Sequence, residues 1–278
     1  MVERRSRKAK VSGSIPENGS TENIRFKKMI KFKIVRDFIQ YVSLIKQLIR
    51  LILTNKINNK LDADFQEINE IDWDFTGDVE PTEITYLPGY FLGDMTILVE
   101  YLILKGFLNR KNKVEMVSST LISKNHCVLF GGNYGKFRRT KRYIHYFTER
   151  AVAKSLGLKL TRLKPNTNKI VLIKFRLDLW KKNINELVDI IYQDLRIGKW
   201  AEYATVNLLD QNILLNTRKC KRHMINHILD QIKLADAWEK YEGFNKNSTV
   251  FSNVAFYYNW RIPHTKFKLN TGSKNPCQ

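Results

Sequence analysis

The stretch LKLTRLKPNTNKIVLIKF, residues 158–175, decides the fold class that the sequence predicts. Apolar and polar residues alternate before a Lys-Pro-Asn-Thr-Asn-Lys turn at 164–169, and β-branched residues follow that turn. A Pro/Asn turn between two such runs predicts a β-hairpin over 158–176. The chain around it has mostly helical patterning. The expected fold is therefore mainly α, a helical bundle with one projecting β-hairpin arm and a helical N-terminal extension.

Upstream of this hairpin, a long helical pattern runs from about residue 24 to 57. Its apolar residues recur every three or four positions and predict one buried stripe, made of Ile34, Phe38, Val42, Ile45 and Ile49. The predicted organisation is a flexible basic arm (1–23), an N-terminal extension with this amphipathic helix and an acidic segment (24–90), a helical RNA-binding domain (91–262) and a C-terminal tail (263–278).

The acidic segment covers residues 61–86, where nine Asp and Glu occur without one Lys or Arg. Their spacing matches no EF-hand pattern, so a solvated or protein-facing segment is expected rather than a metal site.

Downstream, apolar periodicity predicts a series of helices. Their expected ranges are 94–108, 113–123, 141–156, 181–195, 199–211, 218–240 and 250–260.

The charge indicates the class of partner. The chain has 48 Lys and Arg against 27 Asp and Glu, a formal charge of +21, with 43% hydrophobic residues. A folded protein with this much self-repulsion is typical of polyanion binders, above all of proteins that bind nucleic acid. Cys127, Cys220 and Cys277 are odd in number and widely spaced, which indicates a reducing compartment. Ile34 to Leu53 is interrupted by charges, so no membrane partner is expected.

A glycine-rich stretch, Gly131 to Gly135, precedes the densest cluster of cations. No Lys-Ser/Thr pair follows it, so it is not a P-loop. The aromatic residues that interleave with the cations are Tyr134, Phe137, Tyr143 and Tyr146, and they predict stacking on unpaired bases. Phe147 is expected in the core, and a core position is the alternative for Tyr143. The residues expected to contact RNA are Lys136, Arg138, Arg139, Lys141, Arg142, Arg162, Lys164, Lys169, Lys174, Arg176, Arg218, Lys219, Lys221 and Arg222.

The search for catalytic residues predicts no enzyme, no metal and no cofactor. His223 and His227 have helical spacing, but Met224 stands where a zinc protease motif requires Glu. Residues 87–94, LPGYFLGD, are similar to the motif of LAGLIDADG homing endonucleases and intron maturases. That resemblance would make Asp94 a Mg²⁺ ligand, although Met95 replaces the motif's usual glycine and no convincing second motif follows.

A second resemblance covers roughly residues 95–262. The order of helices around the expected hairpin, with WAEYATVNLLDQ at 200–211 and NVAFYYNW at 253–260, resembles the S-seven family of small-subunit ribosomal proteins in a divergent mitochondrial form. The segment at 218–224 is an alternative match for the family's last helix. At the hairpin turn, Lys164-Pro165-Asn166 replaces the family's Arg-Arg-Val-Gly-Gly.

The ribosomal resemblance implies a structural protein of the mitochondrial small ribosomal subunit. Its partners would be the rRNA of the head, neighbouring ribosomal proteins, and messenger RNA and exit-site tRNA near the hairpin. The homing endonuclease or maturase stays open as an alternative, as do other basic nucleic-acid binders such as a viral coat or replication protein.

Overall fold

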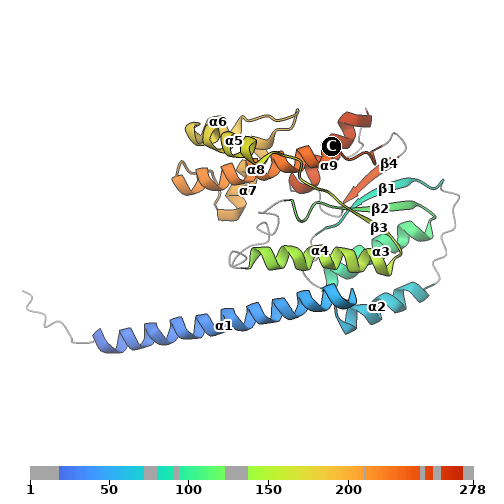
Figure 1. The fold of residues 1–278 in the computed structure, drawn as a ribbon, viewed down its shortest axis with the longest axis horizontal. Helices are drawn as coiled ribbons and strands as arrows, with labels where there is room; N and C mark the ends of the chain where they lie inside the picture. The colour runs from blue at the N-terminus through green and yellow to red at the C-terminus, as the bar shows by residue number, and fades with distance from the viewer. Residues whose placement is uncertain are drawn as a thin grey trace, which may run out of the picture. The chain divides into compact units, whose positions relative to one another are not determined.

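The computed structural model describes residues 19–71, 80–89, 94–122, 137–209, 211–244, 248–252 and 258–271 (Figure 1). The chain divides into two compact units, residues 1–43 and 44–278. The described part is mainly helical, as predicted. The helices are α1 (Gly19–Thr54), α2 (Asn59–Glu70), α3 (Asp94–Asn109), α4 (Arg138–Ser155), α5 (Lys169–Lys181), α6 (Ile184–Val188), α7 (Ile197–Leu209), α8 (Arg218–Glu239) and α9 (Tyr258–Thr271).

A parallel β-sheet, which the sequence did not predict, lies in the second unit. Its strands are β1 (Glu83–Leu87), β2 (Lys113–Ser118), β3 (Lys159–Arg162) and β4 (Ser248–Ser252), in the order β3-β2-β1-β4. All three pairings are parallel, with β1 between β2 and β4. Helices connect the strands, as parallel pairing requires, because a tight turn cannot join two parallel strands.

Alternate residues of the sheet enter two separate cores. Tyr86 and Met116 belong to a cluster with residues of α2, α3 and α4. Leu87 and Val117, their neighbours along the strands, belong to a second cluster dominated by α7 and α8. Figure 1 shows α3 and α4 on one side of the strands and α8 on the other. Both faces are therefore covered, which is the usual condition for an all-parallel sheet.

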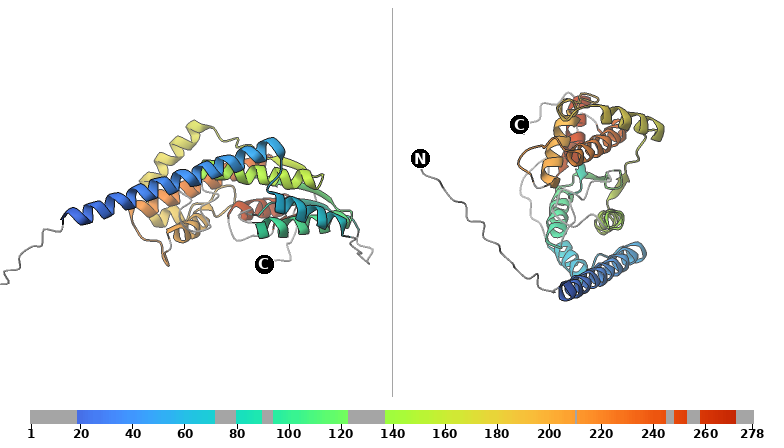
Figure 2. Two further views of the ribbon diagram at one scale, coloured as in Figure 1. Left: turned by 90° about the horizontal axis from the view of Figure 1, so that it is seen from below. Right: turned by 90° about the vertical axis from the view of Figure 1, so that its left-hand side faces the viewer.

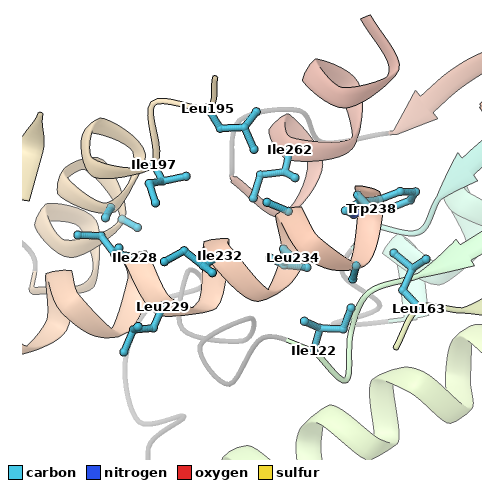
Figure 3. Close-up of a cluster of buried hydrophobic side chains, with 14 of the residues drawn as sticks. Ile122, Leu163, Leu195, Ile197, Ile228, Leu229, Ile232, Leu234, Trp238 and Ile262 are labelled. Atoms are coloured by element: carbon cyan, nitrogen blue, oxygen red, sulfur yellow. The ribbon is translucent and has the colours of Figure 1, made fainter. Parts of the chain in front are cut away.

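Helix α8 is the centre of the second cluster. It is buried along most of its length, from Cys220 to Trp238, and Trp238 is 0% exposed. In Figure 3, Ile228, Ile232 and Leu234 of α8 lie among side chains from α7 and α9. The surrounding residues labelled there are Ile122, Leu163, Leu195, Ile197 and Ile262.

The predicted hairpin over 158–176 is wrong. Its first half forms β3, which pairs in parallel with β2, and its second half forms α5. The side chain of Asn168 caps α5 by accepting a hydrogen bond from the Ile170 backbone N–H, 2.9 Å away. Residues 170–175 lack strict alternation, and a short apolar run of this kind fits a helix as well as a strand. Leu172, Phe175 and Leu179 then face the α8 core.

Three of the predicted helices also differ from the structure. Residues 113–118 of the expected helix 113–123 form strand β2, and the first residues of the expected helix 250–260 belong to β4. Of the expected helix 181–195, Lys181 ends α5, residues 184–188 form the short α6, and residues 189–195 are not helical. The strands are short and their partners lie far away in the chain, so local periodicity did not identify them.

Helix α1 has 36 residues and runs without a break (Figure 2), but its predicted buried stripe is wrong. Ile34 is 61% exposed, Phe38 65% and Ile49 50%. The apolar residues of α1 that pack on the core are Leu51, which is fully buried, and the half-buried Leu44 and Leu48.

The acidic segment contains α2 and β1. Leu61, Phe65 and Ile68 form the buried face of α2, and its carboxylates lie between these positions. The ring of Phe65 stacks on Tyr101 of α3 at a centroid distance of 3.8 Å. This segment therefore contributes a central strand and a packed helix to the second unit.

Within the part of the chain that the structure describes, no helix combines the length and the apolar character needed to cross a lipid bilayer.

The first turn of α7 approaches α6 so closely that it requires glycine. A Cβ atom on Gly198 would lie 2.2 Å from the carbonyl oxygen of Leu187 and 2.4 Å from that of Val188. Gly198→Ala should therefore destabilise the protein by about 1–3 kcal/mol, the usual effect of overpacking. Gly106→Ala in α3, where a new Cβ meets nothing within 4 Å, should stabilise it by roughly 0.5–1 kcal/mol. Urea unfolding measures both, and equal effects of the two substitutions would contradict the close approach.

Candidate nucleic-acid interface

Helix α4 has one apolar side and one basic, aromatic side. Ile144, Ala151 and Val152 are buried in the cluster beneath the sheet, and Phe147 packs against it as expected. The opposite side carries cations and tyrosines at helical spacing. These residues are Arg139, Tyr143, Tyr146, Arg150 and Lys154. Side chains three or four positions apart lie on one face of a helix, so these five form a continuous ridge.

An open groove of about 470 Å³ separates part of this ridge from strand β3. Tyr146, Arg150 and Lys154 line its α4 side, and Leu158 and Leu160 line its β3 side. We call this the α4–β3 groove. Its lining is partly apolar and partly cationic, a combination that suits a ligand with both flat rings and negative charge.

Arg162, the last residue of β3, adds to this surface. Its guanidinium lies 5.6 Å from the centroid of the Tyr146 ring, within the range of a cation–π contact. Stacking of this kind holds the long side chain in place and presents a guanidinium plane beside the groove.

The cations of the groove have no acidic partners among the described residues. Arg150, Lys154 and Arg162 form no ion pair there, whereas nearby Lys159 pairs with Glu115 at 2.9 Å. The first turn of α4 likewise contains no acidic residue, although the positive end of a helix dipole favours one. Lys154 lies in the last turn of α4, and Arg150, Lys154 and Arg162 together form a site for an external anion because no described acidic residue pairs with them.

Beneath the ridge, α4 is fastened to β2 by a buried carboxyl group. Glu149 accepts hydrogen bonds from the hydroxyls of Ser118 and Thr120 at the end of β2. Burial raises the pKa of Glu149 to about 7, and the nearby Glu100 also raises it. The neighbouring His145 is buried too, and burial together with the charge of Lys141 lowers its pKa to about 4. His145 is therefore neutral at pH 7, and Glu149 is only partly ionised.

The predicted RNA-contacting residues fall into two groups in the structure. Four of them, Arg139, Lys141, Arg142 and Arg162, belong to α4 and the end of β3. The others lie on the β3–α5 loop, on α5 and at the start of α8, two helices that pack together. This second group consists of Lys164, Lys169, Lys174, Arg176, Arg218, Lys219, Lys221 and Arg222. Lys136 lies outside the described residues, and of Arg138 only the backbone is described.

Two members of the second group serve the packing of the protein. The Lys221 ammonium donates to the backbone carbonyl of Trp180 at 2.7 Å and lies 5.7 Å from its ring centroid. Arg176 donates to the side chain of Asn226 at 2.7 Å. Both contacts join α5 to α8, so these cations stabilise the helix pair whether or not an anion is bound.

Sequence reasoning missed Arg150 and Lys154, the two cations that line the groove itself. They follow Tyr143 and Tyr146 at helical spacing, so the periodicity of α4 contained the signal. The prediction instead weighted the local density of charge before residue 143. Lys141 and Arg142, from that dense stretch, are half-buried.

The other candidate sites provide no catalytic arrangement. Asp94 lies at the start of α3 and accepts a hydrogen bond from the Asn58 side chain at 3.1 Å. His227 is fully buried in α8. Across the described ranges, no group of three or more His, Cys, Asp or Glu is placed to hold a metal ion.

Comparison of the chain with protein-family models, with curated proteins and with solved structures found no match. The function is therefore argued from the residues of the chain itself.

Glu149 gives the protein a pH-dependent stability that Glu149→Gln should remove. The folded side chain keeps its proton up to about pH 7, whereas the unfolded one loses it near 4.5. The folded state binds more protons in this window, so the contribution of Glu149 to stability falls as the pH rises through it. From pH 4.5 to about pH 7, the free energy of unfolding of Glu149→Gln should rise by about 3 kcal/mol relative to that of wild type. This follows from about 1.4 kcal/mol for each unit by which the pKa is shifted.

Urea unfolding of both proteins across this pH range measures the difference. Glu115→Gln is the matched control with the opposite sign. Burial raises the pKa of Glu115, but hydrogen bonds from Thr161, Lys159 and Tyr241 outweigh it and lower the pKa overall. Glu115→Gln should therefore lose stability relative to wild type as the pH rises. A stability difference between Glu149→Gln and wild type that does not change with pH would contradict the buried, protonated carboxyl group.

Proposed function

We propose that the protein binds single-stranded nucleic acid in the α4–β3 groove. The observation that carries this proposal is the row of cations without acidic partners, Arg150, Lys154 and Arg162, arranged around Tyr146. Cations supply the phosphate contacts that dominate affinity for nucleic acid. An aromatic ring with a guanidinium beside it is a surface on which an unpaired base stacks.

Several features favour a single strand over a duplex. The tyrosines and cations alternate along one helix, so phosphates and bases are contacted at the same time. In a duplex the bases are stacked on one another and their faces are inaccessible to Tyr146. The apolar lining residues Leu158 and Leu160 also suit a base face better than a phosphate chain.

The ribosomal and endonuclease assignments, which came from resemblances in the sequence, remain predictions. Membership of a mitochondrial small ribosomal subunit came from a resemblance that included the hairpin over 158–176, and that segment instead forms β3 and α5. The homing endonuclease alternative gains no support from Asp94, which contacts Asn58 and stands in no described metal-binding group. The proposal therefore retains nucleic-acid binding and makes the choice between RNA and DNA an outcome of the measurement.

Charge reversal in the groove provides the first test. Arg150→Glu with Lys154→Glu should weaken binding of a fluorescent single-stranded RNA by about tenfold or more, measured by fluorescence anisotropy with the full chain. The salt dependence should weaken as well, with a slope of log K against log salt that is smaller by about 1.4 for two lost phosphate contacts.

The control is Lys60→Glu with Lys240→Glu, which makes the same change of net charge at exposed positions on α2 and at the end of α8. It should retain most of the affinity. If both double variants weaken binding equally, the net charge of the chain, and not the groove, governs the interaction.

Replacing the aromatic ring tests the single-strand preference. Tyr146→Ala should lose about 1–3 kcal/mol of binding free energy for single-stranded RNA or DNA, the usual contribution of one stacked base. Binding to a duplex of the same length should change much less. Parallel titrations of single-stranded RNA, single-stranded DNA and duplex measure this, and an equal loss for all three would argue against base stacking.

A further inference from the structure

Helix α1 carries a series of large apolar side chains with high exposed fractions. In residues 34–43, which belong to the first unit, five large apolar side chains are well exposed. They are Ile34 at 61%, Val35 at 55%, Phe38 at 65%, Ile39 at 62% and Tyr41 at 42%. Further along the same helix, Ile49, Ile52 and Leu53 are exposed at 50%, 45% and 75%. Exposed apolar side chains scattered singly are common, but a continuous surface of this kind marks an interaction site.

The exposed residues lie on one side of the helix. Ile34, Phe38 and Tyr41 follow one another at intervals of four and three, and Ile45, Ile49 and Ile52 continue the series. Arg36, Gln40, Ser43, Gln47 and Arg50 form a polar strip at the same intervals on the other side. Leu44, Leu48 and Leu51 occupy a third strip and pack on the core. The helix therefore has an apolar side that is distinct from the strip of leucines with which it packs on the core.

Charge indicates what covers this apolar side. Over Gly19–Thr54 the sequence has eight Lys and Arg against two Asp and Glu, a formal charge of +6. A partner has to offer both an apolar environment and negative charge. A nucleic acid offers phosphates and aromatic bases, but it provides no environment for a row of isoleucines and valines. An anionic lipid surface offers both, because acyl chains lie directly beneath the charged headgroups.

We propose that α1 is an interfacial helix that binds the surface of an anionic lipid bilayer. It lies in the headgroup region with Ile34 and Phe38 toward the acyl chains and with its cations at the phosphates. The helix rests on the bilayer and does not cross it, in keeping with the lack of a bilayer-spanning helix among the described residues. This departs from the expectation that the chain has no membrane partner, which rested on the charges that interrupt residues 34–53.

Self-association through α1 is the competing explanation, and the helix is poorly suited to it. A coiled-coil seam needs a narrow apolar stripe flanked by charges of both signs, which pair across the interface. The apolar side of α1 is broader, since Val35 and Ile39 widen the strip that starts at Ile34. A second copy would also bring a second set of predominantly positive charges to the same interface.

Vesicle binding by the full chain tests the proposal. We expect it to sediment with vesicles of phosphatidylcholine and phosphatidylglycerol, and to bind vesicles of phosphatidylcholine alone much less. Phe38→Glu with Ile39→Glu should reduce binding to the mixed vesicles by roughly tenfold or more, because two carboxylates replace apolar contacts with the acyl region.

The matched control is Gln40→Glu with Ser43→Glu, which adds the same negative charge one to five residues away on the polar strip. It should retain most of the binding. No binding of wild type to the mixed vesicles, or an equal loss in both double variants, would overturn the proposal. So would sedimentation velocity showing a wild-type dimer that Phe38→Glu with Ile39→Glu converts to a monomer, because the apolar side would then be a self-association surface. All the substituted side chains are exposed, and circular dichroism confirms that each variant is folded.

Discussion

Parallel strands cannot be joined by a tight turn, so each connection between β1, β2, β3 and β4 has to run back outside the sheet. In this protein those connections are helices, and they cover both faces of the strands. Tyr86 and Leu87 show the consequence, since neighbours in β1 enter different cores. The sheet is small, but the positions of α3, α4 and α8 all follow from it. Four short strands thus determine where these helices lie, although most of the described residues are helical.

The α4–β3 groove is a product of this arrangement. Helix α4 connects β2 to β3 and covers the sheet at the end of its strand order, where β3 has one neighbour. Its inner side packs in the core, and Glu149 on that side accepts hydrogen bonds from hydroxyls at the end of β2. Its outer side carries exposed residues such as Tyr143 and Arg150, so charged and aromatic residues are tolerated there. A cationic surface at the sheet edge therefore costs little in stability, because those residues remain hydrated.

Sequence reasoning recovered the long helices and missed the sheet for a definite physical reason. Helix periodicity is local, and α3, α7 and α8 could be predicted close to their observed bounds. The pairing of Glu83 with Ser248 joins residues that are far apart in sequence, and no local pattern encodes it. The segment 158–175 illustrates the ambiguity, since its two apolar runs suit either a hairpin or a strand followed by a helix. For the candidate site, Arg162 and Tyr146 could be predicted from charge and aromatic content, whereas Arg150 and Lys154 required the helical spacing of α4.

Net charge alone indicates an anionic partner without distinguishing one polyanion from another. The side chains that accompany the cations make that distinction. On α4 they are tyrosines, flat rings that stack on bases but bury little aliphatic surface. On α1 they are mainly isoleucine, valine and leucine, which gain nothing from a base and much from an acyl chain. The positive charge of +21 is therefore divided between surfaces of different chemistry. Two proteins of equal charge can have different ligands for this reason, and one chain can carry both kinds of surface.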